Sequence, residues 1–307
     1  MAQASGLCEQ AGRLFHFFRR EVFILGGAPR GMGDCGGDGR LNLCKWPDQG
    51  PQRRTCGVIS GFFSALQFLT VLPAPLARPM EKPAFSVAYF PLVGLLLGAI
   101  LVGLDWVLGL FLPSSLVNGG LIIAVIVLTG GLHLDGLMDT CDAIPGAQSP
   151  SRRLEILRDV RVGSYGILGA LSLIMAKYLA LSALPAPLRL PSLLLMPVLG
   201  RWSMALAIPA FPYARPSGLG RAMKDNNSWA RLAAASLISL AISAAALQQV
   251  GVLAMIGAGA VTLLMGWHFT RRLSGLTGDT YGAINEVVEV AALIMVPLAA
   301  GGYRGQP

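Results

Sequence analysis

The sequence carries little charge for its length. Only 13% of its 307 residues are Asp, Glu, Lys or Arg, about half the share found in soluble domains. Such a chain has too few charged side chains to cover a water-soluble surface, so a soluble globular fold is excluded. The net charge is +8, but the basic residues are scattered among short segments and form no stripe, which argues against nucleic acid as a partner.

The cysteines do not form a recognisable pattern either. None of the five is paired in a C-x-x-C motif, so zinc and dithiol redox sites of that type are excluded and we expect no disulfide framework. A secretory signal is also lacking, because Arg19, Arg20 and Glu21 interrupt the first apolar stretch. Residues 1–56 are rich in Gly and lack an apolar period, which predicts a disordered N-terminal extension; a basic amphipathic anchor at 14–25 is the alternative.

Long apolar segments are what the rest of the chain contains. Hydrophobic residues make up 54% of the sequence, and they gather in blocks of about 18 residues or more, the length of a membrane-spanning helix. We therefore predict one all-α transmembrane catalytic domain over 57–307, a polytopic integral membrane helical bundle of about seven spans. The predicted blocks are, to within about three residues, 86–112, 116–134, 163–184, 191–211, 230–247, 250–269 and 284–302.

A shorter apolar block precedes these spans at 57–73. It ends at Pro73 and has basic residues on both sides, so a re-entrant or interfacial helix fits it better than a full span. The connectors between the seven blocks alternate between basic and nearly uncharged, and the basic ones are 135–162, 212–229 and 270–283. Because cytoplasmic loops carry the excess of Lys and Arg, we predict a multi-pass protein of the cell inner membrane with these loops in the cytoplasm.

Three aspartates lie together after the second block. Asp135, Asp139 and Asp142 are spaced i, i+4, i+7, which on a helix puts three carboxylates on one face. Like charges at the end of an apolar span repel one another unless a cation joins them. Oxygen ligands from carboxylates, completed by substrate phosphate, are what Mg²⁺ prefers, so the pattern predicts a Mg²⁺ site.

A second helix is predicted to follow, with Ser149 as its N-cap and Pro150 at its first position. It would present Arg152, Glu155 and Asp159 at i, i+3, i+7 on one face, with Asp159 as a fourth carboxylate. The predicted metal ligands are therefore Asp135, Asp139, Asp142 and Asp159. Arginines beside a divalent metal are typical of phosphoryl transfer, where they bind phosphate oxygens. The candidates are Arg152, Arg153, Arg158 and Arg161.

Four further polar residues are candidates for the same site. Asp279 and Glu286 lie at the start of the last block, on a connector that the charge pattern also puts in the cytoplasm. Lys177 lies inside an apolar block, and His133 borders the aspartates as a base or as a partner of a ligand. Each residue alone is explained as well by helix capping or packing. A cation-coupled transporter also remains an alternative, because carboxylates near a membrane mark ion pathways.

Several runs of the sequence together resemble one family. The runs GLHLDGLMDTCDAIPGA, RRLEILRDVRVGSYG and LTGDTYGAINEVVEV are similar to those of the cobalamin synthases, also called adenosylcobinamide-GDP ribazoletransferases, and the likeness extends over about 57–302. The aspartates are also loosely similar to those of the CDP-alcohol phosphotransferases. The full D-G-x2-A-R-x8-G-x3-D-x3-D pattern of those lipid enzymes is not matched, but such an enzyme stays an alternative.

The resemblance implies a Mg²⁺-dependent membrane transferase of adenosylcobalamin synthesis. Its substrates would be adenosylcobinamide-GDP and α-ribazole or α-ribazole 5′-phosphate, and its products GMP and adenosylcobalamin or its 5′-phosphate. The four aspartates would hold the metal on the diphosphate, and Arg152, Arg153 or Arg161 would balance the charge of the leaving GMP. A homo-oligomer, or a complex with other enzymes of the pathway, is compatible with this interpretation.

Overall fold

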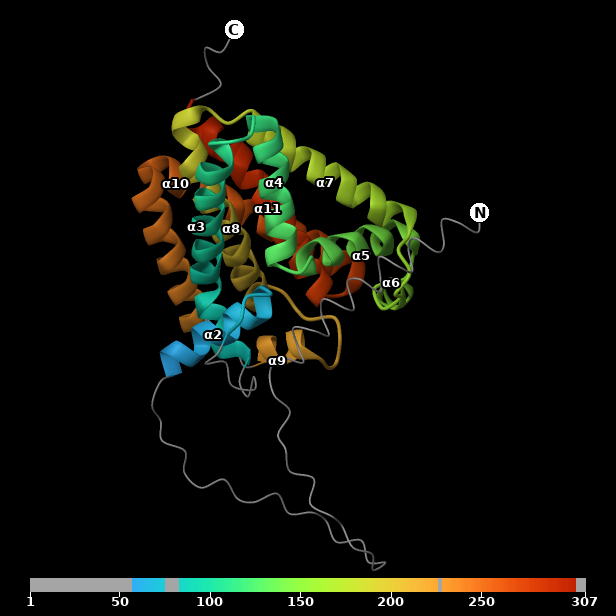
Figure 1. The fold of residues 1–307 in the computed structure, drawn as a ribbon. Coiled ribbons are helices and arrows are strands. Elements are labelled where there is room, and N and C mark those ends of the chain that lie inside the picture. Colours follow the sequence, from blue (N-terminus) through green and yellow to red (C-terminus); the bar gives the residue numbers. More distant parts are fainter. Residues whose placement is uncertain (1–56, 75–82, 226–227, 302–307) are drawn as a thin grey trace, which may run out of the picture. The chain divides into compact units, whose positions relative to one another are not determined.

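The computed structural model describes residues 57–74, 83–225 and 228–301 (Figure 1). In these ranges every element is helical, and the only β contact is one isolated bridge between Tyr213 and Leu276. The extension predicted for 1–56 lies outside the described residues. The elements are α2 (Gly57–Leu69), the 3-10 helix η1 (Pro83–Tyr89), α3 (Phe90–Gly109), α4 (Ser114–Leu128), α5 (Leu132–Gly146), α6 (Pro150–Ile156), α7 (Ser164–Ser182), α8 (Ala186–Ala210), α9 (Leu219–Asp225), α10 (Trp229–Leu273) and α11 (Gly278–Ala299).

The prediction of a helical membrane protein is confirmed. In the described part of the chain, five helices are long and apolar enough to cross a membrane, or up to six if the bent pair α4 and α5 forms one span. The count of about seven is not confirmed. Large apolar side chains are exposed on these helices, as on α7, where Leu168, Leu171 and Met175 are each 58–59% exposed, and this is the surface that lipid covers.

Helix α10 is counted once although it has a break in the middle. The backbone is non-helical at Leu247 and Gln248, where the sequence predicted a turn between two blocks. A side chain on Gly251 would collide with the carbonyl of Ser243, eight residues earlier. In a continuous helix these residues would lie about 12 Å apart, so the chain folds back at the break.

The chain also bends sharply between α4 and α5. The two helices differ in direction by 89°, and the bend is made by Gly130 and Gly131, whose φ angles are +59° and +68°. Such angles favour glycine because it has no Cβ. The predicted block at 116–134 therefore ends early, at Leu128, and the aspartates lie on a separate helix that runs away from the span.

Helix α8 forms the centre of the bundle. It is buried on nearly all sides and packs against α3, α10 and α11. Helix α3 runs alongside it (Figure 1), and a Cβ on Gly94 or Gly98 would collide with the backbone of α8. Small residues let membrane helices approach this closely, so the two glycines fix the α3–α8 pair.

Helix α6 begins as predicted but ends sooner. Ser149 is its N-cap and accepts a hydrogen bond from the backbone N–H of Arg152, and Pro150 occupies the first helical position. The helix ends at Ile156. The expectation that Asp159 shares a helical face with Arg152 and Glu155 is therefore wrong, because Asp159 lies in the loop that leads to α7.

Candidate active site

Four aspartates from two helices form the acidic cluster, which we define as Asp135, Asp139, Asp142 and Asp279. The first three lie on α5 as the sequence predicts, and Asp279 is in the first turn of α11. The negative charges of Asp135, Asp279 and Asp142 all act on the half-buried carboxylate of Asp139. Like charges this close favour a cation among them.

Two glycines bring α5 and α11 together at the cluster. A Cβ on Gly136 would lie 2.7 Å from the backbone oxygen of Asp279 and 3.0 Å from its Cα. A Cβ on Gly282 would lie 3.0 Å from the backbone oxygen of His133. Both distances are too short for an ordinary contact, so the two helices meet at the closest approach that glycine allows. Asp279 is thereby set beside the aspartates of α5.

The carboxylate of Asp142 is hydrogen-bonded to the start of the next long helix, α7. Its Oδ2 accepts a hydrogen bond of 2.8 Å from the backbone N–H of Gly163, and its Oδ1 accepts one of 2.8 Å from that of Gly166. These are two of the N–H groups that the first turn of α7 leaves without a helical partner, and a carboxylate at a helix N-terminus is favoured by the helix dipole. Asp142 therefore ties α5 to α7.

Asp279 is held by an arginine that the sequence analysis did not select. Arg215, in the loop between α8 and α9, donates from Nη2 to Oδ2 of Asp279 at 2.8 Å and to the carbonyl of Leu157 at 3.2 Å. Thr277, the N-cap of α11, also donates to Asp279 at 3.2 Å. Arg215 thus joins the acidic cluster to the loop that follows α6.

The fourth predicted ligand is paired with an arginine of its own loop. Asp159 accepts hydrogen bonds from the side chain of Arg161, the shortest at 2.7 Å, and from its backbone N–H. The Arg161 side chain, through its hydrogen bonds, holds the pKa of Asp159 at about 2. Asp159 is therefore an ionised partner of Arg161.

The remaining predicted arginines have different surroundings. Arg152 pairs with Glu155 at 2.6 Å on the exposed face of α6. Arg153 is buried and donates to the carbonyls of Ile144 and Arg272 at 3.2 and 2.9 Å. Arg158 is exposed in the loop after α6.

Lys177 and Glu286 belong to a buried network in the bundle. Lys177 on α7 donates to Glu286 at 2.7 Å and to Glu289 at 2.6 Å, and Arg201 on α8 pairs with the other oxygen of Glu289. Each of these four side chains is at most 6% exposed. The predicted approach of Glu286 to the aspartates is not seen, since its carboxylate is bonded to Lys177 instead.

His133 lies with this network and not with the acidic cluster. Its ring is buried, and the charges of Arg201, Glu289 and Lys177 act on it. Neither ring nitrogen has a hydrogen-bond partner within the described residues. A buried imidazole among cations is poorly suited to take a proton, so the geometry favours a packing role for His133 over the predicted role of base.

The donor set can be tested against Mg²⁺. In the part of the chain that the structure describes, no three His, Cys, Asp or Glu side chains form a group that could hold a metal. Because Asp142 and Asp159 make the hydrogen bonds described above, the candidate ligands narrow to Asp135 and Asp139. One or two carboxylates completed by water and substrate phosphate are a usual Mg²⁺ site, so this smaller set fits. The four-aspartate site stays a prediction that the geometry does not support.

Sequence reasoning missed the part that Arg215 plays in the site, because Arg215 lies in a basic connector and counts there only toward membrane orientation. The i, i+3 spacing of Glu286 and Glu289 predicts that both acids share one helical face, and the structure buries both. Arg201 and Lys177 lie inside apolar blocks, where a charge usually has a partner, so the sequence predicts that both line the site; in the structure both pair with Glu289.

Sequence comparison finds one matching family and relatives that share one name. The family model described as cobalamin-5-phosphate synthase matches residues 61–297. Proteins named adenosylcobinamide-GDP ribazoletransferase are similar over most of the chain. The one from Roseiflexus sp. (strain RS-1) is 40% identical, covering 81% of this chain and 93% of its own length.

Two further relatives with the same name match to a similar extent. The protein from Desulforamulus reducens is 38% identical over 76% of this chain and 94% of its own length. The protein from Stutzerimonas stutzeri is 39% identical over 77% of this chain and 97% of its own length. No solved structure matches the chain significantly. With a family match over most of its residues, the chain belongs to the cobalamin-5-phosphate synthase family.

Proposed function

We propose that this chain is an adenosylcobinamide-GDP ribazoletransferase, which joins adenosylcobinamide-GDP to α-ribazole or its 5′-phosphate. The observation that carries the proposal is the similarity to relatives of that name over more than nine tenths of their length. The acidic cluster supports it, because carboxylates suited to a divalent cation are the usual equipment for handling a diphosphate.

In the proposed reaction a hydroxyl oxygen of ribazole forms a bond to the phosphorus that carries cobinamide. The bond from that phosphorus to the bridging oxygen breaks, GMP leaves with the electron pair, and the hydroxyl proton is lost to a base. Reactions of this type depend on positioning and on neutralising charge. Mg²⁺ held by Asp135 and Asp139 would supply that neutralisation on the diphosphate.

Cations for the leaving GMP would come from the loop after α6. Its two ends are tied to the acidic cluster, since Arg215 holds the carbonyl of Leu157 and Asp142 holds the N–H of Gly163. The arginines that this loop carries, Arg158 and Arg161, therefore border the carboxylates. Arginine binds phosphate oxygens through paired hydrogen bonds, and we assign the two to the phosphate of GMP.

We place the protein in the cell inner membrane, with the acidic cluster on the cytoplasmic side. The apolar helices support the membrane, and the basic connectors support the orientation. Contact with the lipid bilayer follows. A homo-oligomer or a complex with other enzymes of cobalamin synthesis stays a prediction.

Release of GMP is the direct test. The purified full-length protein is given adenosylcobinamide-GDP, α-ribazole and Mg²⁺, with reactions lacking α-ribazole as the blank. We expect GMP and a cobalamin product in equal amounts, loss of both after chelation with EDTA, and recovery when Mg²⁺ is returned. GMP at the level of the blank would reject the transferase.

The same preparation separates the other candidate functions. CMP released from a CDP-linked lipid would point to an enzyme of the CDP-alcohol type. Cation flux into vesicles that contain the protein, without any GMP release, would point to a transporter.

A further inference from the structure

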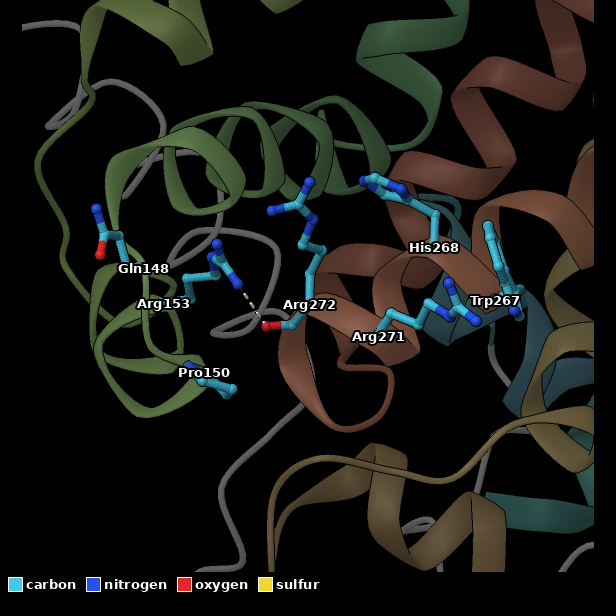
Figure 2. Close-up of a pocket in the computed structure, with 7 residues that line it drawn as sticks. All are labelled: Gln148, Pro150, Arg153, Trp267, His268, Arg271 and Arg272. Carbon is cyan, nitrogen blue, oxygen red and sulfur yellow. Dashed lines mark hydrogen bonds between the residues drawn. The ribbon is translucent and has the colours of Figure 1, made fainter.

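A concave basic site lies between α6 and the end of α10, and none of the carboxylates of the acidic cluster lines it. The cavity has a volume of about 570 Å³. Figure 2 shows the side chains around it. The residues that matter for its chemistry are Gln148, Arg153, Trp267, His268, Arg271 and Arg272.

The positive charge of this cavity has no acidic counterpart among the described residues. None of their side chains that line it is acidic. Within the described ranges, Arg153, Arg271 and Arg272 have no carboxylate within 4.0 Å, whereas Arg161 and Arg215 are each paired with one. Three guanidinium groups in one concave surface favour a bound anion, and arginine matches the oxygens of a phosphate in particular.

Two of the arginines are held in place by neighbouring groups. Arg153 is buried and donates to the backbone carbonyl of Arg272 at 2.9 Å, the contact drawn in Figure 2. The guanidinium of Arg271 lies over the ring of Trp267, 4.2 Å from its centre, a cation–π contact. In the same view the guanidinium of Arg272 lies between the Arg153 side chain and the His268 ring. The charged groups are thus arranged around a common space before any ligand binds.

The position of the cavity along α10 matches the edge of a membrane. The exposed side of the helix carries Leu263 and Leu264, which are 48% and 64% exposed, then Trp267 at 47%, and then the arginines Arg271 and Arg272. These residues cover about 14 Å of helix. An apolar stretch, then a tryptophan, then basic residues is the order in which a span passes from hydrocarbon through the interface to water.

We propose that this cavity binds the phosphate of an anionic phospholipid, whose acyl chains lie along the exposed apolar side of α10. The chemistry recognised is that of a phosphate ester, which a soluble phosphate also offers. The apolar stripe that leads into the cavity favours the lipid, because a soluble ligand would leave Leu263 and Leu264 unused. Basic pockets between transmembrane helices bind anionic headgroups in this way.

The test is a binding measurement on the purified full-length protein. Native mass spectrometry counts the lipids bound as phosphatidylglycerol or phosphatidylcholine is added, and inorganic phosphate serves as the soluble probe. We expect one phosphatidylglycerol to bind at least about tenfold more tightly than phosphatidylcholine. The double variant Arg271→Gln, Arg272→Gln should lose this preference, and Arg271→Lys, Arg272→Lys should recover part of it because lysine keeps the charge.

The matched control is Arg152→Gln with Arg221→Gln, which removes the same charge from exposed positions outside the cavity. It should keep the preference for phosphatidylglycerol. If the first double variant does not purify as a folded protein, Arg272→Gln alone replaces it, since it leaves the contact of Arg271 with Trp267 intact. Equal losses in the two pairs, no preference for phosphatidylglycerol, or inorganic phosphate displacing it from the site would each overturn the proposal.

Discussion

Asp142 and Asp139, two carboxylates of α5, differ in the groups that surround them. Asp142 is bonded to two backbone N–H groups of α7, so its loss would loosen the helix pair. Asp139 is half-buried, and the charges of three other aspartates act on it. A residue whose charge destabilises the fold is a better candidate for function than a residue whose hydrogen bonds stabilise it.

We expect Asp139→Asn to abolish turnover while the protein still folds and inserts. The change removes one of the two carboxylates assigned to Mg²⁺, and losing such a group commonly costs about 100-fold or more in rate. It also relieves repulsion within the cluster, so the unfolding temperature should stay the same or rise. GMP release and thermal unfolding of the purified variant measure the two effects.

Asp225→Asn is the matched control for this variant. Asp225 is an exposed carboxylate at the end of α9 that pairs with Arg221 at 2.7 Å, so its removal should change GMP release by less than about twofold. If Asp139→Asn works as well as this control, the carboxylate is structural and the metal assignment is lost.

For a substitution in the buried network we predict the opposite effect on stability, namely a loss. Glu289 is fully buried and its two oxygens hold Lys177 and Arg201. Glu289→Gln leaves one of these cations without a counter-charge, and breaking a buried pair from one side costs about 3–5 kcal/mol. The variant should unfold at a clearly lower temperature, or accumulate poorly in membranes.

Glu155→Gln provides the comparison, because it also breaks an ion pair with arginine. That pair is exposed on α6, and exposed pairs contribute at most about 1 kcal/mol. Similar unfolding temperatures for the two variants would show that the buried network adds little to stability.

For whole helices, the contact between α5 and α11 is what assembles the site. Gly136→Ala would place a methyl group 2.7 Å from the backbone oxygen of Asp279. The helices must then separate, at a cost of about 1–3 kcal/mol, and Asp279 moves away from Asp139. We expect reduced GMP release together with lower thermal stability.

Gly103→Ala is the control for this substitution. Gly103 lies in α3 with nothing within 4 Å of the added Cβ, and alanine is the better helix former by about 1 kcal/mol. This variant should be as active as the unmodified protein and equally or more stable. Full activity of Gly136→Ala would mean that the close packing has no part in positioning Asp279.

Most of the helices were predictable from the sequence because hydrophobic length in a membrane is a local property. The N-cap at Ser149 and the break near Gln248 were predicted for similarly local reasons. The early ends of α4 and α6 were not. The end of α4 depends on Gly130 and Gly131 adopting positive φ angles, and two adjacent glycines in an apolar block are equally compatible with a continuous helix.

The site was predictable only where one helix carries it. The shared face of Asp135, Asp139 and Asp142 follows from helical spacing. The partners of Lys177 and Asp279 do not, because they come from segments more than 60 residues away in sequence. Spacing alone also could not reveal that Asp142 accepts hydrogen bonds from the backbone of α7 or that Asp159 forms an ion pair with Arg161.

In the molecule as a whole, the basic connectors converge at one end of the bundle. Arg215 donates to Leu157, the buried Arg153 donates to the carbonyl of Arg272, and Tyr213 forms the isolated bridge with Leu276. The loops after α6, α8 and α10 therefore contact one another. If these three loops lie on one side of the membrane, as the charge pattern predicts, contacts of this kind are expected.

This convergence predicts the orientation of the protein. Alkaline phosphatase, which is active only outside the cytoplasm, can be fused after residue 158 or 217 at the basic end, and after residue 112 or 184 at the other. We expect the first two fusions to be inactive and the last two active, with a cytoplasmic reporter giving the reverse pattern. The positive-inside preference supplies the physical reason.

The orientation also decides whether the proposed chemistry can occur. A nucleotide-linked substrate is made in the cytoplasm, so a phosphotransferase with its acidic cluster on the outer face would never meet it. Active alkaline phosphatase after residue 158 would therefore contradict both the assignment of the loops and the proposed function. Activity that alternates as expected would instead place Asp135, Asp139 and Asp279 on the side where GMP is formed, at the same membrane face as the basic cavity beside α10.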